Sequence, residues 1–301
     1  MKILIAGGTG FIGKALTDSL VESSNEVNVL SRRKIDDTKG VKHYVWNIEE
    51  DYIDPNAFDD VQAIINLTGA NIGESRWTKK RKRLIVESRI KPLQLLEKGI
   101  RQFRHNIEVL ISSSAVGYYG AVTTQEIFEE NSANGTDFLA QVCRQWEDEA
   151  HRFESLVERV VILRKGVVIA PNGGMIAKIK PLAKLGINIA MGNGRQILPW
   201  ICLDDLRGVY KHVLQDSRYK GVYNAVSSEY TTINDFSKTL LHSYGRPNLL
   251  PNVPGWAVKI IVGELSSMLL QGSRISNEKI KSEGFNFNCS SLEQCLVDSS
   301  L

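Results

Sequence analysis

The chain has 301 residues, of which 43% are hydrophobic and 24% are charged. These fractions are close to the averages of globular proteins and exclude a disordered chain, a collagen-like repeat and a coiled-coil rod. With 37 Lys and Arg residues against 34 Asp and Glu residues, the formal charge of +3 creates no global field for nucleic acid or an anionic membrane. No stretch of about 18 residues is apolar and uncharged, and the N-terminus shows no signal-peptide pattern. We therefore expect a cytoplasmic protein without a membrane segment.

Four cysteines, Cys143, Cys202, Cys289 and Cys295, are scattered along the sequence. They form no Cys-x-x-Cys pair, and no histidine cluster lies near them in the sequence. This pattern favours reduced thiols over a disulfide framework and offers no zinc ligand set. We therefore expect no metal site.

In the first half of the chain, apolar runs alternate with amphipathic stretches, as is typical of a parallel sheet covered by helices. The expected buried strands are Lys2–Ala6, Glu26–Ser31, Lys42–Trp46, Ala63–Leu67, Val109–Ser112 and Val160–Leu163. The expected helices are Ile12–Glu22, Lys79–Phe103, Phe138–Phe153, Ile233–Ser243 and Pro254–Gln271. After Pro171 the chain becomes rich in glycine and proline, which indicates loops and a soft boundary near residue 170.

A glycine-rich loop directly follows the first predicted strand and begins the first predicted helix. Its sequence is Gly7-Gly8-Thr9-Gly10-Phe11-Ile12-Gly13. In such a loop the first glycine permits a tight turn, the second lets the backbone approach a pyrophosphate, and the third allows the helix to pack closely. The phosphates then face free N–H groups and the positive end of the helix dipole. An ordinary glycine-rich turn is the alternative, but the strand–loop–helix context favours dinucleotide binding.

The end of the second predicted strand distinguishes between the two nicotinamide dinucleotides. An NAD site has an acidic residue about 20 positions after the glycines, which accepts hydrogen bonds from the ribose hydroxyl groups. This sequence has Ser31-Arg32-Arg33-Lys34 there instead. A guanidinium group binds a 2′-phosphate by paired, charged hydrogen bonds, so the sequence favours NADP(H) over a merely solvated basic turn.

Further motifs follow the glycine loop in an order that is known from one protein family. They are Asn66-Leu67-Thr68-Gly69, Ser112-Ser113-Ser114 with Tyr119-Gly120, Leu163-Arg164-Lys165-Gly166 and Trp200-Ile201-Cys202-Leu203-Asp204-Asp205. With them, essentially the whole chain resembles the extended short-chain dehydrogenases/reductases of the NAD(P)-dependent epimerase/dehydratase-like family. It is similar to an atypical, epimerase-like subgroup with its own C-terminal segment. The motifs of this subgroup are Arg76-Trp77-Thr78, Ser88-Arg89, Gly192-Asn193-Gly194-Arg195-Gln196, Pro254, Gly263-Glu264-Leu265 and Gly284-Phe285.

The resemblance implies an α/β fold with a Rossmann-type, doubly wound parallel sheet. Residues 1–170 would form the NADP(H)-binding domain and residues 171–301 a smaller substrate domain, some segments of which return to the first. A helical segment would begin at about residue 250. The residues expected to bind the cofactor are Gly7, Thr9, Gly10, Phe11, Ile12, Gly13, Ser31, Arg32, Arg33, Leu67 and Gly69.

The catalytic residues of the family are only partly present. Ser114 would occupy the position of the family's catalytic serine or threonine, and Ser113 competes for that role. The family's Tyr-x-x-x-Lys pair, in which a tyrosine transfers the proton and a lysine lowers its pKa, is absent. Leu139 and Cys143 occupy those positions. Tyr118, or the tyrosine after it, would supply a phenol instead, unless both pack structurally.

Several residues are candidates for substrate contacts. Arg76 and Arg89 flank the basic run Lys79–Arg83 and would bind an anionic substrate. The run lacks the interleaved aromatic residues of a nucleic-acid site. In the glycine-rich segment, Arg195 and Trp200 are further candidates.

Two interpretations of function follow. The first is an NADP(H)-binding epimerase or oxidoreductase that acts on a small carbonyl or hydroxyl substrate. The second is a non-catalytic protein that senses NADP(H) or binds a partner, which the absent Tyr/Lys pair favours. A homodimer is compatible with the sequence, whereas nucleic-acid and membrane partners are not expected.

Overall fold

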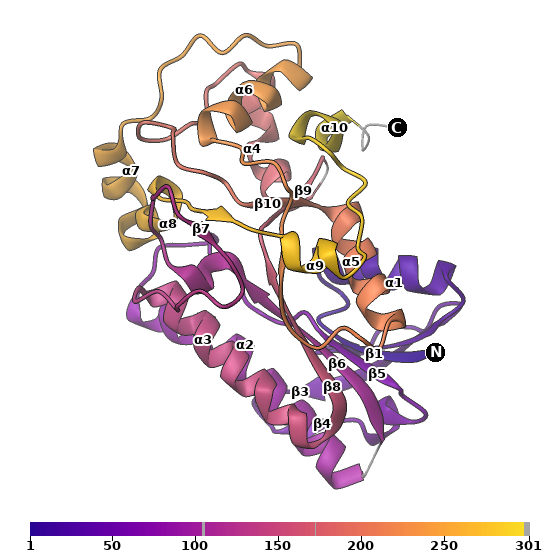
Figure 1. Ribbon diagram of the computed structural model, residues 1–301. Helices are drawn as coiled ribbons and strands as arrows, with labels where there is room; N and C mark the ends of the chain where they lie inside the picture. The colour runs from indigo at the N-terminus through magenta and orange to yellow at the C-terminus, as the bar shows by residue number, and fades with distance from the viewer. Residues whose placement is uncertain (104–105, 172, 298–301) are drawn as a thin grey trace.

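The computed structural model describes residues 1–103, 106–171 and 173–297, and an eight-stranded sheet forms its centre (Figure 1). The strand order is β11-β8-β6-β5-β1-β2-β3-β4. All neighbouring strands are parallel except β3 and β4. The strands are β1 (Lys2–Ala6), β2 (Glu26–Ser31), β3 (Val41–Asn47), β4 (Tyr52–Ile53), β5 (Ala63–Asn66), β6 (Ile107–Ala115), β8 (Val157–Lys165) and β11 (Gly221–Ala225).

Helices cover both faces of this sheet (Figure 1). They are α1 (Phe11–Glu22) and α5 (Leu203–Gln215) on one face, and α2 (Lys79–Phe103) and α3 (Phe138–His151) on the other. In the central strand β1, Ile3 and Ile5 pack toward α1 and α5, while Leu4 and Ala6 pack toward α2 and α3. A strand that is buried on both faces needs apolar residues at every position, which explains the unbroken apolar run at the start of the sequence.

A smaller lobe lies beyond the carboxyl ends of the parallel strands, at the top of Figure 1. Its core is formed by α4 (Gly174–Lys184), α6 (Ile233–Ser243), α10 (Leu292–Val297) and the parallel pair β9 (Val167–Ala170) and β10 (Trp200–Cys202). None of the helices in the described ranges has the length and apolarity needed to cross a bilayer. The elements outside the main sheet and its covering helices are β7 (Ile127–Phe128), β9 (Val167–Ala170), α4 (Gly174–Lys184), β10 (Trp200–Cys202), α6 (Ile233–Ser243), α7 (Gly255–Val262), α8 (Ser266–Leu270), β12 (Arg274–Ile275), α9 (Glu278–Ser282) and α10 (Leu292–Val297).

The predicted bounds of β1, β2, α2 and α6 are confirmed. The prediction of one helix over Pro254–Gln271 is wrong, because Gly263 adopts a φ of +63° and separates α7 from α8. The sequence analysis also missed α5 and β11. Both come from the chain beyond residue 170, yet α5 covers one face of the main sheet and β11 is its edge strand.

Candidate functional site

The glycine loop between β1 and α1 leaves space for an anion at the N-terminus of the helix. Gly7 has a φ of +85°, which would strain any residue with a side chain. A Cβ atom on Gly13 would lie 2.2 Å from the carbonyl oxygen of Gly7, so the third glycine is required for packing. Gly10 is exposed, has an ordinary φ of −78°, and precedes a helix that no side chain caps. The first N–H groups of α1 are therefore available to a phosphate.

The start of α4 packs on this loop. Thr9 is exposed, and Ile12 packs against the core on the α1 side of the sheet. The ring of Phe11 lies directly against Gly173, where an added Cβ atom would approach a ring carbon to 1.9 Å. Gly174 also contacts this ring. The smaller lobe is thus in contact with the loop that we predicted to bind the cofactor.

The end of β2 lies next to the glycine loop, because Leu30 pairs with Ala6 of β1. Ser31 is buried, and its hydroxyl group donates to the carbonyl oxygen of Arg33 at 2.6 Å, which fixes the turn. Arg32 and Arg33 are both exposed. Within the described residues, neither guanidinium group has a hydrogen-bond or ion-pair partner, so both are available to an incoming anion.

The loop after β5 approaches the glycine loop with its backbone. Asn66 is buried, and its Oδ1 atom accepts a hydrogen bond from the hydroxyl group of Thr68 at 2.6 Å. This bond folds the chain sharply after the strand. The carbonyl carbon of Leu67 lies only 3.1 Å from where a Cβ atom of Gly7 would be. The two loops therefore lie in contact at the carboxyl ends of the neighbouring strands β1 and β5.

Ser114 points from β6 toward α3 and is buried. Its hydroxyl group donates to Oε1 of Glu147 at 2.6 Å. The same carboxylate forms a two-point ion pair with Arg164, with Nε–Oε1 at 2.9 Å and Nη2–Oε2 at 2.8 Å. Both partners are buried. The Ser114 hydroxyl group is thus engaged by a buried ion pair.

The two tyrosines after the serine run differ in their surroundings. Tyr119 is buried, and its hydroxyl group donates to Oδ1 of Asn224 at 2.7 Å. Burial raises the pKa of Tyr119 to about 12, which keeps the phenol neutral. The ring centre of Tyr118 lies 3.4 Å from the guanidinium carbon of Arg164. No described residue forms a hydrogen bond with the Tyr118 hydroxyl group, which leaves this phenol available to a ligand.

Ser113 points to the opposite face of β6 and contacts a lysine that the sequence analysis did not select. Its hydroxyl oxygen accepts a hydrogen bond from Nζ of Lys165 at 2.9 Å and lies 2.8 Å from the hydroxyl oxygen of Tyr210 on α5. Lys165 is partly buried at the carboxyl end of β8. Burial, and then the positive charge of Arg89, lower the pKa of Lys165 to about 7. Such an amine gains and loses a proton near neutral pH.

An arginine from α2 lies near the position where the family's lysine is missing. Burial raises the pKa of the Cys143 thiol to about 12, so this thiol does not replace the lysine. The charge of Arg89 acts on the pKa of both Cys143 and Lys165, which indicates that its guanidinium group is close to both. This group lies 5.0 Å from the ring centre of Trp146, and an added Cβ atom on Gly69 would approach it to 3.2 Å. Arg89 therefore supplies positive charge at this edge of the sheet.

Comparisons with known proteins show the family of this chain. The sequence profile of the NAD dependent epimerase/dehydratase family matches residues 3–225. The chain belongs to this family. A second profile, described as a domain of unknown function (DUF1731), matches residues 253–299.

The relatives match this epimerase-family protein along nearly its whole length. It is 33% identical to the epimerase family protein Mb2239 of Mycobacterium bovis, with 98% of this chain and 96% of that protein covered. It is 31% identical to the epimerase family protein SDR39U1 of Mus musculus, with 99% of both covered. The crystal structure of human epimerase family protein SDR39U1 with NADPH matches with a TM-score of 0.88 and 28% identity, covering 99% of this chain and 98% of that chain.

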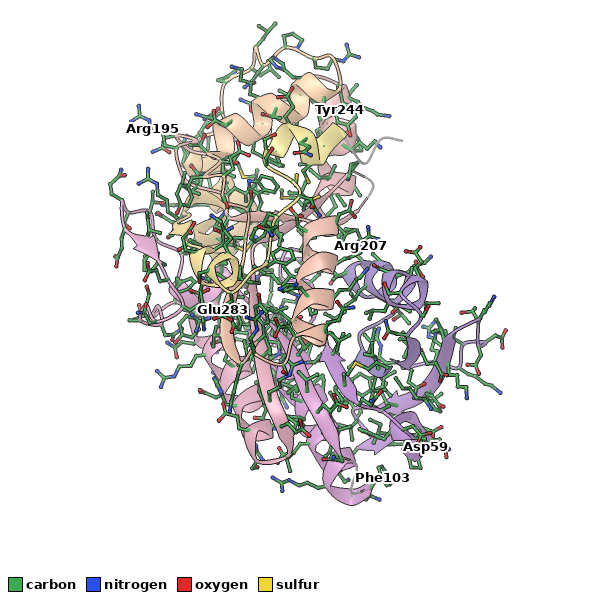
Figure 2. All side chains as sticks on the ribbon, turned by 45° about the vertical axis from the view of Figure 1, so that its right-hand side comes forward. Asp59, Phe103, Arg195, Arg207, Tyr244 and Glu283 are labelled. Carbon is green, nitrogen blue, oxygen red and sulfur yellow. The ribbon has the colours of Figure 1, made fainter. Side chains whose placement is uncertain are left out.

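Three of the predicted substrate residues form no hydrogen bond with Lys165 in the described part of the chain. Trp200 is 1% exposed, and its indole N–H group donates to the hydroxyl oxygen of Thr231 at 2.8 Å, so the structure places it in the core of the smaller lobe. Arg195 projects outward from this lobe (Figure 2). Arg76 donates to the carbonyl oxygen of Ile260 in α7. Arg89 is the one candidate of the four that interacts electrostatically with Lys165.

Three of the four cysteines, which are scattered along the sequence and suggested no ligand set, meet in the structure. The sulfur atoms of Cys202, Cys289 and Cys295 all lie within 4.8 Å of one another. Sequence spacing did not reveal this cluster, because its members come from separate segments. Lys165 carried one sequence signal, since it ends an apolar strand at the edge where ligands bind in this fold.

Proposed function

We propose that this protein binds NADP(H) and transfers hydride to or from a small carbonyl or hydroxyl substrate, as an oxidoreductase or epimerase. The observation that supports this choice of cofactor is the position of Arg32 and Arg33, unpaired within the described residues and next to the glycine loop. In NAD-binding proteins of this fold, an acidic residue at this position accepts hydrogen bonds from the ribose hydroxyl groups. The similarity to human SDR39U1, which was crystallised with NADPH, supports the same choice.

The residues at this edge fit the cofactor. Gly10 and the N–H groups of α1 would hold the pyrophosphate, while Arg32 would bind the 2′-phosphate with support from Arg33. Leu67 and Gly69 would line the ribose. The bound cofactor supplies or accepts the hydride.

The proton, in this proposal, is held by Lys165 and passes through Ser113. In the direction of reduction, the substrate oxygen gains negative charge and takes the hydroxyl proton of Ser113. Nζ of Lys165 then donates a proton to Oγ of Ser113 and so restores the hydroxyl group. In oxidation the neutral amine accepts the proton by the same route. The lowered pKa of Lys165 keeps both protonation states populated near neutral pH, and Tyr210 orients the Ser113 hydroxyl group.

Ser114 and Tyr118 remain alternatives for this step. For Ser114 to polarise the substrate, its hydroxyl group must first leave Glu147, to which it donates at 2.6 Å. Tyr118 has an available phenol but no described neighbour that would accept its proton. The geometry therefore favours Ser113 with Lys165.

Cofactor choice is tested by calorimetric titration of the Arg32→Ala variant with NADPH and NADH. Loss of a charged hydrogen bond to phosphate weakens binding by roughly 1.5–3 kcal/mol, so NADPH affinity should fall about 10- to 100-fold. NADH affinity should hardly change. Lys34→Ala, which removes an exposed cation from the same turn, is the matched control. Equal losses for both cofactors in Arg32→Ala would contradict the assignment.

Catalysis is tested by following NADPH absorbance with a panel of ketones, enones and sugar nucleotides. With an active substrate, Lys165→Met and Ser113→Ala should each lower kcat by about 10²–10⁴-fold while NADPH affinity stays the same. The wild-type rate should change near pH 7, and Lys165→Met should lose this inflection. A larger effect of Ser114→Ala or Tyr118→Phe than of Lys165→Met would reassign the proton donor.

The absent Tyr/Lys pair supports one alternative function, a non-catalytic NADP(H) sensor. In that case NADPH should bind with the same dependence on Arg32, but no member of the panel should be converted. Lys165→Met would then leave every measured property except stability unchanged.

A further inference from the structure

Three buried thiols meet in the smaller lobe. Cys202 ends β10, Cys289 lies in the segment before α10, and Cys295 lies within α10. They are 6%, 8% and 0% exposed, and their sulfur atoms all lie within 4.8 Å of one another. The cluster therefore joins the C-terminal segment of the described chain to the beginning of α5.

Cys202 lies at the N-terminus of a helix, which favours negative charge on its sulfur. Cys202 is the N-cap residue of α5, whose first turn also contains two carboxylates, Asp204 and Asp205, that oppose this charge. The thiol of Cys295 donates to the carbonyl oxygen of Ile169 at 3.8 Å, and the thiol of Cys289 donates to that of Ser291 at 3.2 Å, so each must release its proton to bind a metal. The N-terminus of a helix favours a thiolate, which is the form of cysteine that binds metals.

A metal ion would use all three sulfurs, whereas a disulfide would join two and leave the third unused. Because no two of these sulfurs are more than 4.8 Å apart, an ion at the centre of the group lies at most about 2.8 Å from each, compared with about 2.3 Å for a Zn–S bond. Shifts of about half an ångström per side chain would close this gap. Among the described residues, no histidine nitrogen or carboxylate oxygen joins the group. An all-sulfur ligand set selects soft ions such as Zn²⁺ and Cu⁺ over Mg²⁺ or Ca²⁺.

We propose that Cys202, Cys289 and Cys295 bind one thiophilic d¹⁰ metal ion in a buried three-sulfur site. Zn²⁺ is the ion that we expect, because with three thiolates it leaves one net negative charge in the apolar core, whereas Cu⁺ leaves two. The ion would hold α10 against the start of α5 and so stabilise the C-terminal segment. This proposal does not depend on the proposed enzymatic function.

The test is metal titration of the full chain after reduction and removal of metal with a chelator. Zn²⁺ is added in competition with a chromophoric chelator, and Cd²⁺ is added separately to record thiolate-to-metal charge transfer in the ultraviolet. We expect one equivalent to bind and the thermal midpoint to rise. A parallel titration with Cu⁺ under anaerobic conditions determines which ion binds more tightly.

The variants separate this site from ordinary surface binding. Cys295→Ala and Cys289→Ser should each lower Zn²⁺ affinity at least about 100-fold, since each removes one of only three ligands. Cys143→Ser is the matched control, because it removes the fourth buried thiol, which lies outside the cluster, and it should bind Zn²⁺ like the wild type. Circular dichroism and NADPH titration verify that each variant is folded.

Two results would overturn the proposal. The first is that the wild-type protein binds Zn²⁺ and Cd²⁺ no more tightly than the Cys295→Ala variant does. The second is rapid formation of a Cys202–Cys295 disulfide by hydrogen peroxide at the same rate with and without one equivalent of Zn²⁺. That result would identify the cluster as a redox pair.

Discussion

Replacement of Lys165 by methionine is expected to stabilise the protein below pH 7, because it removes an amine that is costly to charge in its partly buried position. The pKa of Lys165 is about 7 in the folded protein, against a reference value of 10.5. Between these two pH values the unfolded chain binds a proton at this site that the folded chain does not. This amine therefore makes the wild type more stable as the pH rises from about 7 to 10.5. Outside that range it adds no pH dependence to the free energy of unfolding.

The magnitude follows from the same difference in pKa. At about 1.4 kcal/mol per pKa unit, the charged amine lowers the free energy of unfolding by at most about 5 kcal/mol below pH 7. Partial exposure of the side chain reduces this value. Above the reference pKa the amine is neutral in both the folded and the unfolded chain. The charge then no longer lowers the free energy of unfolding of the wild type, and Lys165→Met is no longer more stable for this reason.

Urea titration followed by circular dichroism measures this effect at about pH 6 and about pH 10. The difference in unfolding free energy between Lys165→Met and the wild type should be large at the lower pH and small at the higher pH. Lys98→Met is a suitable control, because the Lys98 side chain is 50% exposed. A difference that is the same at both pH values would refute the lowered pKa, and with it the proposed role of Lys165 in proton transfer.

Two further pairs of variants test the glycine loop and the buried ion pair. Gly10→Val should abolish NADPH binding without unfolding the protein, whereas Gly13→Ala should lower the thermal midpoint itself, because its Cβ atom would overlap the loop. Normal NADPH binding by Gly10→Val would contradict the phosphate site. Glu147→Gln should lower the free energy of unfolding by about 3–5 kcal/mol, since it leaves the buried Arg164 without a counter-charge. Asp216→Asn breaks an ion pair whose arginine is 77% exposed and should change it far less, and equal losses in urea titration would show that burial is unimportant.

The cofactor half of the site was largely predictable from sequence because its signals are local. The largely apolar strand Lys2–Ala6 leads directly into the glycine loop. Glycine is required at Gly7 and Gly13 because a side chain there would meet the backbone of this loop or of the neighbouring loop. Arg32 follows the next strand, and parallel pairing of adjacent strands brings it to the same edge. Each of these inferences needed only the order of residues and the geometry of one βαβ unit.

The residues that we propose for proton transfer, and the thiol cluster, are brought together only by tertiary structure. Alternation along a strand predicts that Ser113 and Ser114 face opposite sides, but not which side holds Glu147 and which holds Lys165. That was decided by the parallel register in which Ala115 of β6 pairs with Lys165 of β8.

Sequence by itself determined the strand–loop–helix unit and the basic turn that follows its partner strand, because those contacts form between neighbouring segments. Tertiary structure decided where the chain beyond residue 170 returns: β11 joins the edge of the sheet at β8, and α10 brings Cys295 to Cys202. No local pattern marks such contacts, because their residues are far apart in the sequence and meet only when separate elements pack into one core.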